Sequence, residues 1–163
     1  LSAETADGRY PVETVEMMAS ICVEAESAEE ISLDAGFTNK TFGRIDQSIA
    51  MAALFTAYHL SCKAILALTE SGSTALWMSR QKIHVPIFGI TSQIRSQRRM
   101  AMYRNVTPLL MPSFADRDEA LKHAEQLLVA AGVLKPGDTY GITCGEPMGY
   151  PGGTNMLKVV RVA

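Results

Sequence analysis

The chain has 163 residues, of which 47% are hydrophobic and 20% charged, and its formal net charge is −2. These values are ordinary for one globular domain and exclude intrinsic disorder. Since the net charge is small and no basic run is longer than Arg98-Arg99, a nucleic-acid partner is not expected. No signal peptide precedes the first regular segment and no apolar run is long enough to span a bilayer, so no membrane partner is expected either.

The cysteines and histidines give no sign of a metal site. Cys22, Cys62 and Cys144 are odd in number and far apart, and the three histidines are equally scattered. No pair has metal-ligand spacing, and a disulfide framework is not expected. We therefore predict a reducing, cytoplasmic location, no bound metal, and thiols that act as small buried hydrophobic groups.

The first regular segment is a helix. Leu1–Thr5 has the composition of a polar turn, and Pro11 stands where helices prefer to begin. From Val12 to about Ala25 the apolar residues recur at helical spacing. The stretch from Glu26 to Gly43 loses this periodicity and is rich in Ser, Gly and Asn, which predicts a linker.

Helices then alternate with short apolar strands. The helix that follows the linker is expected to bury one face, formed by Ile45, Ile49, Ala52, Ala53, Thr56 and Leu60. Strands are expected at Lys63–Thr69, Pro86–Thr91, Val106–Met111, Thr139–Cys144 and Met156–Ala163, and helices at about Ser73–Gln81, Ser92–Tyr103 and Asp116–Ala131. Since no helix separates the last two strands, they are expected to pair in antiparallel fashion. The fold class is α/β: a three-layer αβα sandwich with a mostly parallel five-stranded sheet and one antiparallel strand near an edge.

One candidate site is the loop "TESGST", which joins the first buried strand to a helix. It comprises Thr69, Glu70, Ser71, Gly72, Ser73 and Thr74. Hydroxyls and free backbone N–H groups at a helix N-terminus favour an anion. The alternative is that Ser71 or Ser73 only caps the helix.

The second candidate is "CGEPMGYPGGTN", Cys144–Asn155, which contains four glycines and two prolines in twelve residues. Its site residues are Gly145, Gly152, Gly153 and Thr154. If the strands leading into the two loops are parallel, both loops lie at one end of the sheet and could share one phosphorylated ligand. The alternative is a long, idle solvent loop.

These motifs resemble the C-terminal part of the pyruvate kinase family. "LSAETADGRYPVETV" is similar to the stretch that follows that family's last barrel strand. The family's T-x-S-G-x-[ST]-A loop is matched by Thr69, Ser71, Gly72, Thr74 and Ala75, and its closing glycine motif by Gly145, Gly152, Thr154 and Asn155. The resemblance covers essentially the whole chain and looks closest to the bacterial type activated by sugar monophosphates and AMP.

The resemblance implies three parts. Residues 1–26 would end the catalytic (β/α)8 barrel, including a helix left over from it, 27–43 would be a linker, and 44–163 an effector-binding and oligomerisation domain. Thr5 would be the active-site threonine near the phosphoryl and enol groups of the substrate. The parent enzyme, a cytoplasmic homotetramer of glycolysis, would use Mg²⁺ and K⁺. Its catalytic lysine and metal ligands would lie upstream, so this fragment is expected to be inactive and to hold no cofactor itself.

One departure from the family concerns the first loop. Several relatives place Arg or Lys after "SG", where this chain has Ser73. The predicted effector is a phosphorylated sugar or nucleotide monophosphate, bound through backbone N–H groups and hydroxyls, and Thr74→Ala and Gly72→Val are expected to leave the fold intact. The alternatives are a free-standing phosphate-ligand-binding module, which the resemblance of Leu1–Gly8 argues against, and a purely structural assembly domain.

Overall fold

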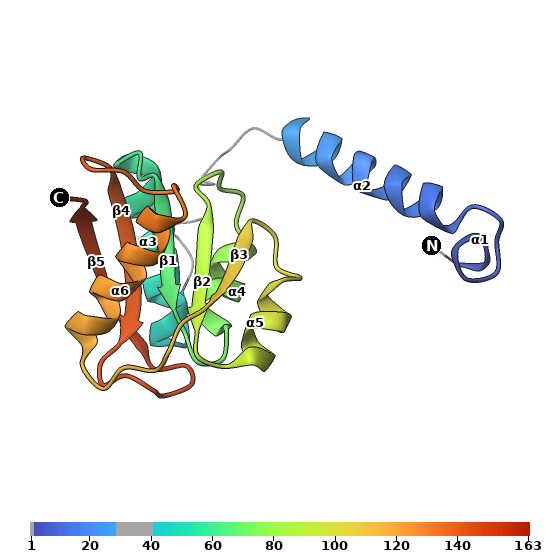
Figure 1. Cartoon of the computed structure of the whole chain (residues 1–163). Coiled ribbons are helices and arrows are strands. Elements are labelled where there is room, and N and C mark those ends of the chain that lie inside the picture. The colour runs from blue at the N-terminus through green and yellow to red at the C-terminus, as the bar shows by residue number, and fades with distance from the viewer. Residues whose placement is uncertain (1, 29–40) are drawn as a thin grey trace. The chain divides into compact units, whose positions relative to one another are not determined.

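A computed structural model describes residues 2–28 and 41–163, which belong to two separate compact units (Figure 1). The first unit contains helices α1, Ala3–Ala6, and α2, Pro11–Ala28. α2 begins at its proline, as predicted. The polar turn expected at the N-terminus is instead a single helical turn, in which the N–H groups of Thr5 and Ala6 donate to the Ser2 carbonyl. Most of the predicted linker, residues 29–40, lies outside the described residues, and residues 27 and 28 still belong to α2.

Apolar side chains of α2 are largely exposed. Val12 and Val23 are 64% and 65% exposed, and Ile21 is 56% exposed. Cys22 is exposed as well, so the expectation that every cysteine is buried is wrong for this one, although Cys62 and Cys144 are buried. Among the described residues of this unit, α2 has only the short α1 beside it and no core in which to bury such groups.

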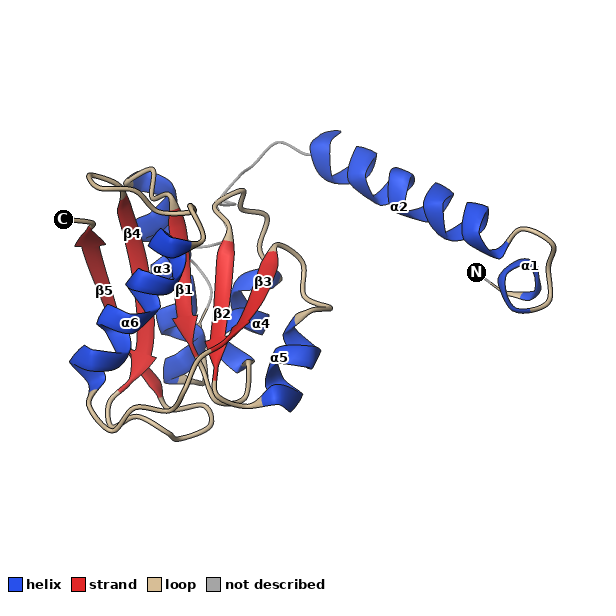
Figure 2. Cartoon of the chain, in the orientation of Figure 1, coloured by secondary structure: helices blue, strands red, loops and turns tan. Residues whose placement is uncertain are grey.

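The second unit is built on a five-stranded sheet with the order β3-β2-β1-β4-β5 (Figure 2). The strands are β1, Ala64–Leu68, β2, Ile87–Thr91, β3, Val106–Leu110, β4, Thr139–Gly145, and β5, Thr154–Arg161. β1 pairs in parallel with β2 and β4, and β2 with β3, whereas β4 and β5 are antiparallel. β1 and β2 are buried along their whole length, as continuous apolar runs predict. Pro108, which lacks an N–H group, lies on the edge strand β3.

Helices cover both faces of this sheet (Figure 2). The helix α6, Arg117–Ala130, packs on one face through Ala120, Leu121, Ala124 and Leu128. The other face carries α3, Ile45–His59, α4, Ser73–Ser79, and α5, Ile94–Met100. The predicted three-layer α/β fold with one antiparallel edge strand is therefore confirmed.

The buried face predicted for α3 is wrong. Of the six residues expected to be buried, Ala53 is, whereas Ile45 and Leu60 are 69% and 54% exposed. The helix instead buries Asp46, Ala50, Met51, Ala53, Leu54 and Ala57. This face is rotated by roughly a quarter of a turn from the prediction. The helix is apolar on most sides, so the pattern alone could not select the face.

None of the helices in residues 2–28 and 41–163 is long and apolar enough to cross a membrane.

Candidate functional site

The connectivity of the sheet creates a switch point between β1 and β4. From β1 the chain moves outward through β2 and β3, then returns to the opposite side of β1 as β4. Ligands of open α/β sheets bind outside the carboxyl ends of strands at such a point. Because β1 and β4 are parallel, their following loops, 69–74 and 145–153, do lie at the same end of the sheet. This was the geometric condition for a shared ligand.

The first loop is held by its own hydroxyls and by a neighbouring helix. The Gly72 N–H donates to Thr69 Oγ1 at 3.0 Å, and the Ser96 hydroxyl of α5 donates to the Glu70 carbonyl at 2.6 Å. The helix that follows has Gly72 at its N-cap position without a side-chain cap. Ser73 Oγ instead donates to Asp46 Oδ2 at 3.2 Å. The helix-capping alternative is therefore wrong for Ser73, whereas the Ser71 hydroxyl oxygen does accept from the Ser73 N–H, at 3.4 Å.

The second loop is closed at its base. The Glu146 N–H donates to Asn155 Oδ1 at 2.9 Å, and Asn155 Nδ2 donates to the Glu146 carbonyl at 2.7 Å. The two arms approach so closely that a Cβ at Gly145 would lie 2.8 Å from the Gly153 carbonyl oxygen. These glycines are required by the packing of the loop itself.

One hydrogen bond joins the two loops directly. Thr74 Oγ1 and Thr154 Oγ1 are 2.7 Å apart, and both residues are buried. Thr74 is therefore part of the core, and Gly72 has a φ of 79° with Met100 Cγ only 3.0 Å from a would-be Cβ. The premise that neither position belongs to the core is therefore wrong, and both Thr74→Ala and Gly72→Val are expected to destabilise the fold.

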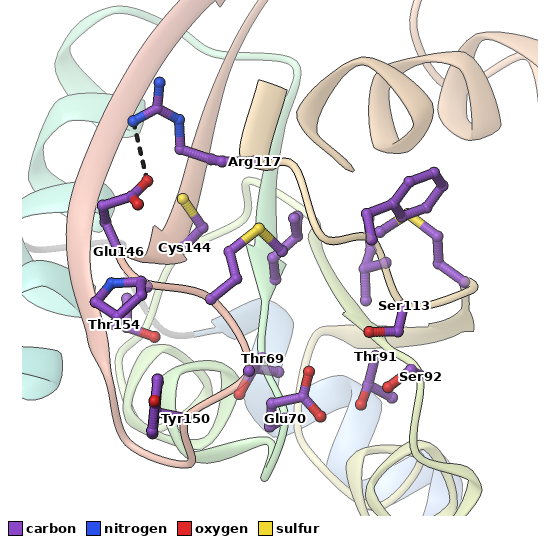
Figure 3. A pocket seen from close by; sticks show the side chains of 18 of the residues that line it. Thr69, Glu70, Thr91, Ser92, Ser113, Arg117, Cys144, Glu146, Tyr150 and Thr154 are labelled. Carbon is purple, nitrogen blue, oxygen red and sulfur yellow. Dashed lines mark hydrogen bonds and ion pairs between the residues drawn. The ribbon is translucent and has the colours of Figure 1, made fainter. Parts of the chain in front are cut away.

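A cavity of about 290 Å³ opens at the switch point, and both loops line it (Figure 3). The predicted site residues that line the cavity are Thr69, Glu70, Gly145, Gly152 and Thr154. The other predicted residues, Ser71, Gly72, Ser73, Thr74 and Gly153, lie in the same two loops but are not part of its wall. The two loops thus contribute to one concave site, with half of the predicted set in its lining.

Sequence reasoning missed the far wall of this cavity. It consists of Thr91 and Ser92 at the end of β2, Ser113 and Phe114 after β3, and Arg117 at the start of α6. In Figure 3, Thr91, Ser92 and Ser113 lie across the cavity from Glu146 and Thr154. The missed signal was positional, since each segment follows the carboxyl end of a parallel strand.

Charges in the cavity wall are few and partly paired. Arg117 Nη1 donates to Glu146 Oε2 at 3.0 Å, and Arg117 Nε donates to Asp118 Oδ1 at 2.9 Å. The hydrogen bond and charge of Asp118, with the charge of Glu146, raise the pKa of Arg117. Glu70 is the remaining charged residue of the lining, with its carboxylate 3.4 Å from Gln93 Nε2.

Two other lining residues differ sharply in exposure. Cys144 is fully buried, and burial raises the pKa of its thiol, which keeps it protonated and a poor nucleophile at neutral pH. Tyr150, which also lines the cavity, is 67% exposed. An exposed aromatic ring beside a polar cavity offers a flat surface on which a ligand ring can stack.

Thr5, the predicted catalytic residue, belongs to the first unit and lies in α1. Its hydroxyl oxygen is buried and has no hydrogen-bond partner among the described residues. In those residues no group of three or more His, Cys, Asp or Glu side chains is placed to hold a metal ion.

The fold and the cavity together define an α/β domain with a concave cavity at its switch point. The family model for the pyruvate kinase alpha/beta domain matches residues 47–160, and the chain belongs to this family.

The chain is also similar to complete pyruvate kinases. It is 40% identical over 163 residues to a pyruvate kinase of Buchnera aphidicola subsp. Baizongia pistaciae, covering 99% of this chain and 34% of that protein. Pyruvate kinase II of Salmonella typhimurium gives the same identity and coverage. A pyruvate kinase of Haemophilus influenzae is 38% identical over 146 residues, covering 89% of this chain and 30% of that protein. The chain thus spans about a third of the length of the curated relatives it matches.

Proposed function

We propose that this chain is the regulatory part of a pyruvate kinase and binds a phosphorylated effector in the cavity between the 69–74 and 145–153 loops. The observation that carries this proposal is the cavity of about 290 Å³ at the switch point, lined by both loops. Its volume is near the lower end of small-molecule sites, which suits a monophosphate of a sugar or a nucleoside.

The threonine and serine hydroxyls in the cavity wall can donate hydrogen bonds to a phosphate group. Thr69 Oγ1 and Thr91 Oγ1 each accept a backbone N–H, from Gly72 at 3.0 Å and Gln93 at 3.1 Å. A hydroxyl that accepts through its oxygen can still donate its own proton, and phosphate oxygens accept such bonds. Ser92 and Ser113 add two more hydroxyls to the wall.

Charge favours one phosphate group over two. The lining holds one cation, Arg117, and two carboxylates, Glu70 and Glu146. Carboxylates repel phosphate oxygens but accept hydrogen bonds from sugar hydroxyls. We therefore infer a ligand with a single phosphate and several hydroxyls, such as ribose 5-phosphate or AMP, over fructose 1,6-bisphosphate.

Calorimetric titration of the chain with these three ligands tests the proposal. Arg117→Gln should weaken binding of a monophosphate at least tenfold, since a charge-assisted hydrogen bond is worth about 1.5–3 kcal/mol. Arg161→Gln, an exposed arginine on β5 outside the cavity wall, is the matched control and should bind like the parent chain. If none of the three ligands binds, the two loops do not form an effector site and the proposal is contradicted.

The second candidate, a purely structural assembly domain, is favoured by one observation. The Thr74–Thr154 and Glu146–Asn155 hydrogen bonds satisfy several loop groups without any ligand. A failed titration together with self-association of the chain would select this function.

The assembly proposal rests on the outer face of α3. Ile45, Phe55 and Tyr58 are 69%, 44% and 42% exposed there, and the His59 ring lies 4.3 Å from that of Phe55. Phe55, Tyr58 and His59 form a neighbouring set of rings at the end of α3, which fits an interface between copies of the chain, as in a tetramer. Light scattering should show self-association that Phe55→Lys reduces, and a parent chain that is monomeric at all concentrations contradicts it.

The complete protein, by this proposal, is cytoplasmic and transfers a phosphoryl group from phosphoenolpyruvate to ADP in glycolysis. Thr5 would contact the substrate, which suits its unpartnered hydroxyl oxygen. Mg²⁺ and K⁺ would be held by other parts of a longer chain. An assay of the 163-residue chain with all substrates and ions should show no pyruvate above background, and turnover by the pure chain contradicts the proposal.

A further inference from the structure

A charged carboxylate is buried at the start of α3. The Asp46 side chain is 1% exposed, and its oxygens accept from four donors. Arg44 donates through Nε to Oδ1 at 2.8 Å and through Nη2 to Oδ2 at 2.7 Å. The Gln47 N–H donates to Oδ1 at 3.0 Å, and Ser73 Oγ donates to Oδ2 at 3.2 Å. Burial alone would raise the pKa of Asp46, but these hydrogen bonds and the charge of Arg44 hold it below its ordinary value.

This carboxylate connects both loops of the candidate site. Ser73 belongs to the first loop and is also the first residue of α4. On the other side, a Cβ at Gly152 would lie 2.9 Å from Arg44 Nη2, so the guanidinium packs against the second loop. Next to Ser73, the Thr74–Thr154 hydrogen bond joins the two loops a second time.

Asp46 itself is not part of the cavity wall, and neither are Arg44 and Ser73, whereas Gly152 and Thr154 are. Its influence on a ligand must therefore pass through the loops it holds. An ion pair whose carboxylate is buried adds little net stability compared with apolar residues of the same size, because taking the charge out of water costs free energy. Its fixed geometry can instead set the spacing of the groups around it, and a site held in place before binding loses less entropy when a ligand arrives.

We propose that Asp46 is a positioning residue, which fixes the separation of the 69–74 and 145–153 loops through Ser73 and Arg44 and so prepares the cavity for its ligand. This inference rests on the proposed effector binding. It assigns a role in that binding to a residue that touches no ligand.

Calorimetric titration with ribose 5-phosphate and AMP tests the role. Asp46→Asn keeps the shape but removes the charge that pairs with Arg44, and we expect affinity to fall about tenfold or more. Arg44→Lys keeps the charge but cannot pair with both carboxylate oxygens, so a several-fold loss is expected. The Arg44 side chain is 55% exposed, so this variant should fold even if Asp46→Asn does not.

Tyr140→Phe is the matched control for general destabilisation. It removes another buried hydrogen bond to a carboxylate, from the Tyr140 hydroxyl to Glu125 Oε2 at 2.7 Å. Tyr140 is the second residue of β4, at the end of the sheet opposite the cavity. We expect this variant to lower the thermal midpoint and to leave the affinity unchanged.

The outcomes separate this inference from the proposed function. Weakened binding in both charge variants, with an unchanged control, supports the positioning role. If the parent chain binds and both Arg44→Lys and Asp46→Asn bind as tightly as the parent, the inference is overturned and effector binding stands. The same conclusion follows if Tyr140→Phe loses as much affinity as the two charge variants. If the parent chain binds neither probe, both the proposed function and the inference are overturned.

Discussion

At the residue scale, the buried carboxylate of Asp46 makes the stability of the second unit depend on pH. Its pKa is held below the ordinary 3.8 in the folded chain. Since the folded state binds the proton less readily than the unfolded state, the stabilisation is complete above pH 3.8 and is lost as the pH falls through the lower folded pKa.

Urea unfolding at pH values from about 2.5 to 7 tests the direction of this pH dependence, because carboxyl groups titrate within that range. The free energy of unfolding should fall steeply at the acid end, and Asp46→Asn should make that fall shallower. Part of the fall should remain, because the hydrogen bond from Arg117 lowers the pKa of Asp118 as well. Identical acid slopes in the two proteins would contradict the assignment.

Tyr150 gives a prediction about ligand choice. An exposed tyrosine in the cavity lining can stack its ring on a nucleobase, and such stacking is worth about 1–3 kcal/mol. Tyr150→Ala should therefore weaken AMP roughly tenfold and leave ribose 5-phosphate, which has no base, almost unchanged. Calorimetry with both ligands measures the ratio. An equal loss for both would show that Tyr150 shapes the loop and does not contact a base.

The sequence could predict some site residues and not others. Thr69 and Gly145 stand in loops whose composition departs from the rest of the chain, and both line the cavity. Arg117 and Ser113 are ordinary residues far away in the sequence, and only the closing of the sheet brings them to the cavity. The role of Asp46 was not predicted, because its partners Arg44 and Ser73 could not be inferred from spacing.

At the element scale, α6 was predictable because residues close together in the sequence indicate both where the helix begins and which face it buries. The Asp116 carboxylate accepts from the Glu119 N–H at 2.8 Å, as is typical of an aspartate at an N-cap position. Ala120, Leu121, Ala124 and Leu128 recur at helical spacing and are buried, whereas Ala131 at the C-cap is exposed. In α3 the apolar residues surround the helix, so tertiary packing alone decided which face is buried.

The cap and the stripe of α6 make different contributions. Asp116→Ala should lower the free energy of unfolding by about 1 kcal/mol, since one N-cap bond is lost. Leu128→Ala, at a fully buried position, should cost about 2–5 kcal/mol through lost burial and a cavity. Lys122→Ala, exposed on the same helix, is the control and should change stability by less than about 0.5 kcal/mol. Urea unfolding gives all three values, and an unstable control or a neutral Leu128→Ala would contradict this view of the helix.

At the scale of the whole molecule, the alternation of helices and short apolar strands was enough to predict the layers of the sheet. The strand order was not predicted, because no local pattern states that β4 returns to the far side of β1. The proposed domain limits at 26 and 43 remain a prediction.

The two units should differ in stability. The second has an extensive core, whereas α2 exposes Val12, Ile21 and Val23 and has one other short helix among the residues of its unit that the structure describes. Amides of α2 should therefore exchange with solvent much faster than those of β1 and β4 in dilute, monomeric chain. Mass spectrometry of exchanged fragments measures this difference. Slow exchange of α2, equal to that of the central strands, would contradict the independence of the second unit.

A crystal structure of the chain with ribose 5-phosphate tests the central claim most directly. The account predicts that the phosphate lies in the switch-point cavity, between Thr69–Glu70 of the first loop and Gly145–Thr154 of the second, within hydrogen-bond distance of the Thr69 hydroxyl or Arg117. A ligand bound elsewhere on the surface, or an empty cavity in a crystal grown at saturating ligand, would contradict it.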